Sequence, residues 1–85
     1  MTFKQKLTMD ILQHQEGGTH YKQCAIQPIE FISANNLNFS EGNIVKYTTR
    51  HKSKNKDEDI KKVIHYAKFI LKFEYNYTDE QLQEL

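Results

Sequence analysis

Apolar residues recur along this chain at the spacing of three and four that is typical of a helix, and no strand-like alternation persists for long. The clearest case is the segment 57–76, where one stripe contains Ile60, Val63, Ile64, Ala67, Ile70, Leu71 and Tyr75. A second stripe adjoins it and contains Tyr66, Phe69, Phe73 and Tyr77. Carboxylates at 57–59 suit the positive end of a helix dipole. The pattern predicts a long helix whose first stripe belongs to the core.

Three shorter segments also carry helix signals. Residues 3–15 have apolar positions at helical spacing in a polar stretch, which either frays or docks on a partner chain. Pro28 suits the first turn of a helix over 28–36. Ser40 is a good amino cap for a helix over 41–52. Residues 22–28 are compatible with an extended segment that has no evident partner strand. We therefore expect an all-α, or nearly all-α, domain of three to four helices.

The two stripes of the long helix form a wider apolar surface than one small layer of helices covers. Part of this surface is therefore expected to pack on another subunit, which makes the protein a homo-oligomer. The alternative is that the segment 3–15 folds back over the second stripe.

The length of 85 residues supports one domain, with a core near the lower limit for independent folding. Residues 1–15 are interpreted as a polar arm or helix, residues 16–77 as the helical domain and residues 78–85 as a short acidic tail. Cys24 is the only cysteine, so a disulfide within one chain is excluded and a reducing cytosol is the natural setting. No apolar run is long enough to cross a membrane. We expect a soluble, intracellular protein with no membrane partner.

The formal net charge of +1 offers no general case for binding long nucleic acids. The distribution of charge is more informative, because the segment 46–56 contains several lysines, an arginine and a histidine without a single acid. This run is either a local cationic surface or a solvated helix end.

Standard catalytic and metal-binding motifs are missing from the sequence, including the phosphate loop, the GxGxxG fingerprint and the HExxH zinc motif. The sequence does contain side chains that are suited to binding phosphate. Asn43, Lys46 and Arg50 are spaced to project from one face of a helix, where arginine offers a planar fork and lysine a mobile charge. In the competing interpretation, Arg50 pairs structurally with an acid such as Glu41 or Asp57 in a subunit contact.

The adjacent glycines Gly17 and Gly18 form a second candidate group. A pair of glycines lets backbone N–H groups approach an anion closely, where a side chain would block the approach. His20 and Tyr21 would supply donors and a stacking ring beside it. The alternative is that the glycines only end a preceding helix in a left-handed turn.

The order of four short motifs gives the sequence a family resemblance. "GGTHY", "IQPIEFI", "NNLNFSEGNIVKYTTRHKSKN" and "EDIKKVIHY" follow one another between residues 17 and 66, within a resemblance that covers residues 16–72. In this order and spacing they resemble a small bacteriophage domain family, also called SaV-like, whose described member is a nucleotide kinase without a standard phosphate loop. The resemblance implies a phage protein that acts in the cytoplasm of an infected bacterium, a compact helical domain and binding of nucleotide phosphates.

The resemblance also covers the candidate site residues. The positions that match the family motifs are Gly17, Gly18, His20, Tyr21, Glu30, Phe31, Asn43, Lys46, Tyr47, Arg50, Lys54, Glu58, Asp59, Lys62, His65 and Tyr66. The ligand-binding residues are expected among the glycines, His20, the basic residues Lys46, Arg50, Lys54 and Lys62, Asn43, and the rings of Tyr21, Tyr47 and Tyr66.

Three functions are compatible with these residues. In a nucleoside monophosphate kinase, Asp59 or Glu58 would hold magnesium, and His20 or His65 would handle the acceptor. In a non-catalytic sponge for the cyclic nucleotide signals of bacterial defence, the same cations and rings would hold the ligand without metal. In a module that binds a host protein, the stripe of Tyr66, Phe69 and Phe73 would form the contact.

Overall fold

The computed structural model describes residue 21 and residues 24–85. This part of the chain contains helices α2 (Pro28–Ala34), α3 (Phe39–Arg50), α4 (Asp57–Tyr75) and α5 (Asp79–Gln83), with a short 3-10 helix η1 (His51–Ser53) between α3 and α4. No strand occurs in it. The expected all-α fold is confirmed. The candidate residues Gly17, Gly18 and His20, and the predicted amino-terminal helix, lie outside the described residues.

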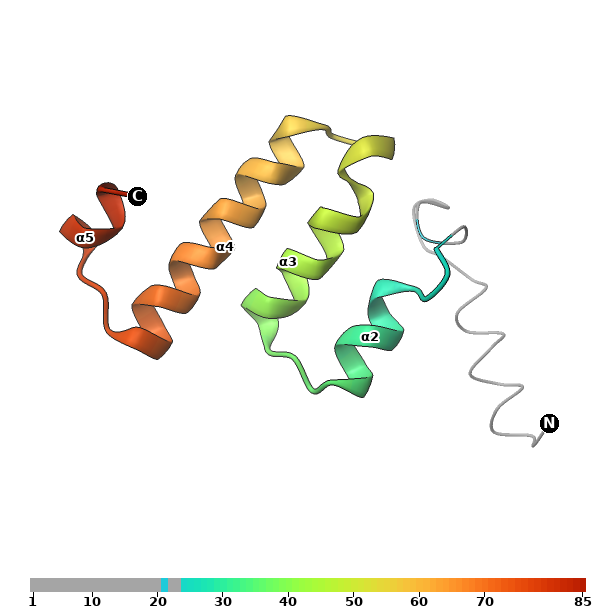
Figure 1. Cartoon of the computed structure of the whole chain (residues 1–85), viewed down its shortest axis with the longest axis horizontal. Coiled ribbons are helices and arrows are strands. Elements are labelled where there is room, and N and C mark those ends of the chain that lie inside the picture. The colour runs from blue at the N-terminus through green and yellow to red at the C-terminus, as the bar shows by residue number, and fades with distance from the viewer. Residues whose placement is uncertain (1–20, 22–23) are drawn as a thin grey trace.

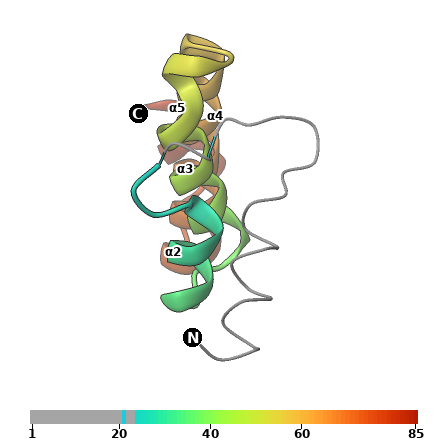
Figure 2. The same ribbon diagram turned by 90° about the vertical axis from the view of Figure 1, so that its right-hand side faces the viewer.

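Helices α2, α3 and α4 form a single layer, with α3 in the middle (Figure 1). Helix α3 packs most extensively on α4 and also packs on α2, whereas α2 does not contact α4. Seen from the side, the three helices overlap as a thin slab (Figure 2). Helix α5 contacts α4 and no other described helix. The layer is therefore one helix thick, and α3 and α4 each have two open faces.

Local sequence signals determine where α3 begins. The Asn38 side chain accepts a hydrogen bond from the Glu41 amide at 2.9 Å, and the Glu41 carboxylate accepts one from the Asn38 amide at 2.9 Å. This reciprocal capping box starts α3 at Phe39. The prediction that Ser40 is the cap is wrong, because Asn38 has the matching glutamate three residues later. Asn38 Nδ2 also donates to Glu74 at 2.7 Å, which ties the start of α3 to the end of α4.

The long helix follows the prediction closely and ends one residue early. Asn76 adopts a left-handed conformation with φ of 60°, which terminates α4 after Tyr75. Thr78 and Gln81 then form a second capping box, which starts α5 within the segment interpreted as an acidic tail. Lys72 Nζ bonds Asp79 at 2.6 Å and joins α5 to α4. A threonine followed three residues later by a glutamine has the spacing of a capping box, so the start of α5 is a local signal of the sequence.

Very few apolar side chains are buried in this layer. Leu82 and Pro28 are the buried apolar side chains of the described chain. Ile64 is 53% exposed and Tyr75 64% exposed, so their assignment to the core is wrong. The physical reason is that α3 covers one side of α4, and the five-residue helix α5 contacts α4 much less extensively than α3 does, so that Ile64 and Tyr75 remain uncovered.

Candidate functional site

An ion pair between Arg50 and Asp59 joins the last turn of α3 to the first turn of α4. Arg50 Nε donates to Asp59 Oδ2 at 3.1 Å, and Arg50 Nη2 donates to Asp59 Oδ1 at 3.2 Å. The arginine is 8% exposed and the aspartate 0% exposed. Two parallel N–H···O bonds between a guanidinium and a carboxylate give both strength and a defined orientation. The pair therefore fixes how the two helices meet.

Two further groups surround the Asp59 carboxylate. Asn55 Nδ2 donates to Oδ1 at 3.4 Å, and Lys62 Nζ lies 3.6 Å from the same oxygen. The hydrogen bonds from Arg50 lower the pKa of Asp59 from its ordinary value to about 2, against the opposing effect of burial. The carboxylate is therefore ionised throughout the physiological range.

The ring of Tyr47 is the centre of a cationic cluster. Lys46 Nζ lies 5.0 Å, Arg50 Cζ 4.6 Å and Lys62 Nζ 4.9 Å from its centroid. Such distances are within the range of cation–π attraction. On α4, the ring of Tyr66 is stacked with that of Tyr47 at 6.0 Å and an interplanar angle of 13°. The cluster holds three cations against one carboxylate, that of Asp59, which gives this face an excess of positive charge.

Tyr21 extends the cluster from the segment ahead of α2. Burial raises the pKa of its hydroxyl above the ordinary value, and the hydrogen bond with the neighbouring Arg50 guanidinium opposes only part of this rise. The sequence placed Tyr21 and Arg50 in separate motifs, and the fold brings them together.

A small hollow adjoins this cluster on the same side of the layer. It has a volume of about 140 Å³ and is lined by Tyr21, Gln27, Pro28, Ile29, Ile32 and Lys46. Lys46 belongs to both the hollow and the cation cluster. One ligand could therefore place an anionic group at Lys46 and an apolar group in the hollow between α2 and α3.

The structure separates the predicted site residues into two sets. It brings together Tyr21, Lys46, Tyr47, Arg50, Asp59, Lys62 and Tyr66. The others are directed to different partners: Asn43 Nδ2 donates to the Phe39 carbonyl, Glu58 pairs with Lys61 at 3.3 Å, and His65 packs on Phe69 at 4.5 Å. Lys54 is exposed in the turn before α4. The ligand-binding and catalytic roles of these residues stay predictions.

The competing interpretation of Arg50 named the wrong acids. Arg50 does form a structural ion pair, but with Asp59 of its own chain and not with Glu41 or Asp57. Glu41 is committed to the cap of α3, and Asp57 lies 3.9 Å from Lys61. Asp59 is two residues beyond Asp57, which turns its side chain by about 200° around α4, toward α3.

Aromatic side chains continue from Tyr66 toward the far end of α4. Phe39 packs edge-on against Tyr66 at 5.8 Å, and Phe69 stacks with Phe73 at 6.0 Å. Phe39 is 77% exposed and Phe73 72% exposed. The contact with a host protein at this stripe remains a prediction. The exposed rings of Phe39 and Phe73 could take part in such a contact.

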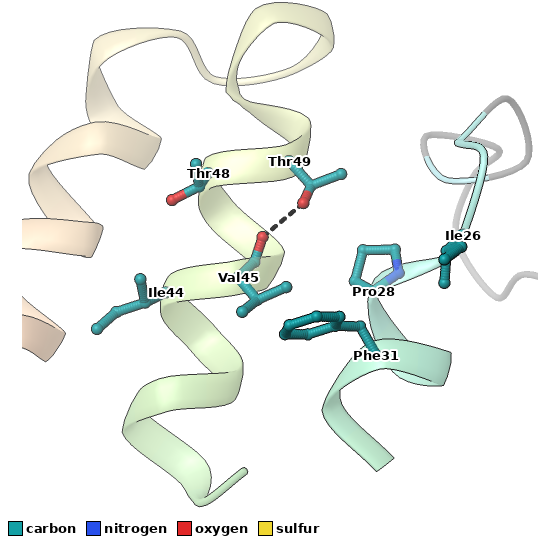
Figure 3. A pocket seen from close by; sticks show the side chains of 7 residues that line it. All are labelled: Ile26, Pro28, Phe31, Ile44, Val45, Thr48 and Thr49. Carbon is teal, nitrogen blue, oxygen red and sulfur yellow. Dashed lines mark hydrogen bonds between the residues drawn. The ribbon is translucent and has the colours of Figure 1, made fainter. Parts of the chain in front are cut away.

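A larger apolar groove lies between α2 and α3 (Figure 3). Its volume is about 420 Å³, and it is lined by Ile26, Pro28, Phe31, Ile44, Val45, Thr48 and Thr49. None of these side chains is charged. The Thr49 hydroxyl donates to the Val45 carbonyl at 2.7 Å, so its polar atom is used within α3.

Within the described ranges, no group of three or more histidine, cysteine, aspartate or glutamate side chains is placed to hold a metal ion. Nor does this part of the chain contain a helix with the length and apolar character needed to cross a membrane.

Comparisons with known proteins point to a family without an assigned activity. No curated protein and no solved structure matches the chain. A family model described as a protein of unknown function, DUF3310, matches residues 15–68. The match covers more than half of the chain and includes α2, α3 and the first part of α4 with the whole Arg50–Asp59 connection. The chain therefore belongs to the DUF3310 family.

Proposed function

We propose that this protein binds the phosphate groups of a nucleotide at the cationic cluster around Tyr47. The observation that carries the proposal is the convergence of Lys46, Arg50 and Lys62 on one tyrosine ring, with Asp59 as the accompanying carboxylate. A surface with excess cations attracts anions such as phosphate.

The three cations have different tasks in this proposal. Arg50 is buried and bonded to Asp59, so it orients the cluster. The Lys62 side chain is 43% exposed and Lys46 lines the neighbouring hollow, so these lysines are the groups that contact phosphate. The apolar wall of the hollow, formed by Ile29 and Ile32, would receive the less polar part of the ligand.

The resemblance to a phage nucleotide kinase makes phosphoryl transfer one form of this function, in the cytoplasm of an infected host. Capture of a cyclic nucleotide signal is the second form, and one observation favours it. Both Asp59 oxygens accept hydrogen bonds from Arg50, which occupies the carboxylate that a kinase would use for magnesium. Glu58 is exposed and paired with Lys61.

Calorimetry with matched lysine variants tests the binding site. The titrants are deoxynucleoside monophosphates, a nucleoside triphosphate with magnesium, and cyclic dinucleotides. Loss of a charge-assisted contact costs about 1.5–3 kcal/mol, so Lys46→Ala and Lys62→Ala should each weaken binding roughly 10- to 150-fold. Lys61→Ala is the control, because it removes the same charge from the adjacent position of α4 and should leave the affinity unchanged.

The same experiment can reject the proposal. Equal affinities for wild type, Lys62→Ala and Lys61→Ala would place the ligand elsewhere, and absence of binding by all titrants would remove the nucleotide. A product assay with triphosphate, magnesium and monophosphate then separates the two forms. Phosphoryl transfer that Glu58→Gln reduces supports the kinase, whereas binding without transfer supports capture.

A further inference from the structure

The layer of α2, α3 and α4 has an apolar face opposite the cationic cluster. Thr48 lies two residues from both Lys46 and Arg50, which turns it about 200° around α3, to the side of the groove. Ile60 and Ile64 have the same relation to Lys62 on α4. Figure 3 shows Val45 and Phe31 directed toward each other across the groove. We call this surface the groove face; its residues are Ile26, Phe31, Val45, Thr48, Ile60 and Ile64.

The groove face needs a covering layer. Ile26 is 60%, Phe31 47% and Ile64 53% exposed, while Leu82 and Pro28 are the buried apolar side chains of the described ranges. A chain of this length folds on a small margin even when its apolar residues are buried. Leaving both faces of a single helical layer in water would forgo most of the available hydrophobic stabilisation.

We infer that the groove face is covered by the groove face of a second copy of this chain. Two identical faces related by a two-fold axis pack the same surface against itself, and residues near the axis lie close to their own counterparts. A face with net charge therefore repels itself, and a neutral face does not. The opposite face carries Lys46 and Lys62 and would place cations against cations. The groove itself is lined by uncharged side chains throughout. Charge therefore selects this face for self-association and leaves the cationic cluster open to solvent.

The dimensions of the face agree with a dimer contact. Helix α4 has 19 residues and α3 has 12, so they are roughly 28 Å and 18 Å long at about 1.5 Å per residue. With helices spaced about 8–10 Å apart, the layer presents on the order of 500 Å² in projection, and more as accessible surface. Stable interfaces use about 800 Å² from each partner.

A charge placed in the centre of the groove face tests the inference. Thr48 is exposed in the single chain, and glutamate has a better helix propensity than threonine, so Thr48→Glu should not weaken α3 itself. In a two-fold dimer it brings two carboxylates together in an apolar interface. Ser33→Glu is the control, because Ser33 is exposed on α2 and does not line the groove.

Sedimentation equilibrium of the full chain gives the readout. The inference expects the mass of two copies for wild type and for Ser33→Glu, and the mass of one copy for Thr48→Glu with its helical circular dichroism retained. The thermal midpoint of wild type should rise with protein concentration, and that of Thr48→Glu should not. A wild type that remains a single copy at about 100 µM would overturn the inference, as would an oligomer that Thr48→Glu leaves intact. If wild type remains a single copy, the groove face is covered by the chain's own amino-terminal residues or by another protein. If Thr48→Glu leaves the oligomer intact, the contact between copies lies on the stripe of Tyr66, Phe69 and Phe73.

Discussion

Arg50 and Asp59 lie nine residues apart and meet through two hydrogen bonds, at 3.1 and 3.2 Å, and both residues are buried. The pair spans the connection through η1 and sets the register of α3 against α4. The same guanidinium lies over the Tyr47 ring at 4.6 Å. Helix packing and the candidate binding surface therefore depend on one side chain.

The first prediction concerns the loss of this arginine. Arg50→Ala should lower the thermal midpoint by about 10 °C or more, because it leaves the Asp59 charge buried without its partner. Arg50→Lys should lower it less, since an ammonium keeps the charge but cannot form the two-point pair. Differential scanning calorimetry measures both.

The double variant Arg50→Met with Asp59→Leu is the matched control. It removes both charges and keeps apolar volume between α3 and α4, so it should recover most of the lost stability. A double variant that is as unstable as Arg50→Ala would show that the ionic contact itself, and not the unpaired charge, determines stability.

The second prediction concerns acid. The Asp59 carboxyl has a pKa of about 2 in the folded chain, and an unfolded aspartate has a pKa of about 3.9. A lowered folded pKa contributes stability that is present above pH 4 and is lost as the pH falls toward 2. Thermal midpoints measured from pH 5 to pH 2 should fall more steeply for wild type than for the double variant without either charge. Parallel curves would contradict the assignment.

The third prediction concerns alkali. Burial raises the pKa of the Tyr21 hydroxyl in the folded chain, so its neutral form stabilises the fold below pH 10 and this contribution is lost as the pH rises through the raised value. Ultraviolet titration of the five tyrosines should show one phenol that ionises late. Tyr21→Phe should remove this late component, and Tyr75→Phe, at an exposed position, should not. If the late component persists in Tyr21→Phe, it belongs to another ring.

The fourth prediction concerns the approach of α2 to α3 at Gly42. A Cβ atom at this position would lie 3.3 Å from Ile32 Cγ2. Gly42→Ala should change the free energy of unfolding by less than about 1 kcal/mol, because the gain in helix propensity offsets slight crowding. Gly42→Leu should cost about 1–3 kcal/mol, since its side chain must displace α2. Urea denaturation measures both, and equal stability of the two variants would show that α2 is free to move.

The sequence determined the helices, because helix formation depends on neighbours three and four residues apart. The apolar spacing over 57–76, the proline at 28 and the acidic first turn of α4 were each sufficient to place an element within a few residues. Helix starts are also determined locally, because Asn38 with Glu41 and Thr78 with Gln81 each have the spacing of a capping box. Ser40 was the wrong cap, because the residue three positions later is Asn43 and not a glutamate or glutamine.

Tertiary structure alone decided which side chains meet. Lys46 and Arg50 could be placed on one helix face from their spacing, but their convergence with Lys62 on Tyr47 requires the antiparallel return of α4 along α3. The choice of Asp59 over Asp57 as the partner of Arg50 depends on the rotation of α4 about its axis, which packing determines. Burial was also decided by the tertiary structure. Periodicity shows that the face of α4 containing Ile64 is apolar, which is why the sequence predicts that it belongs to the core. The arrangement of the layer shows that no described element covers Ile64.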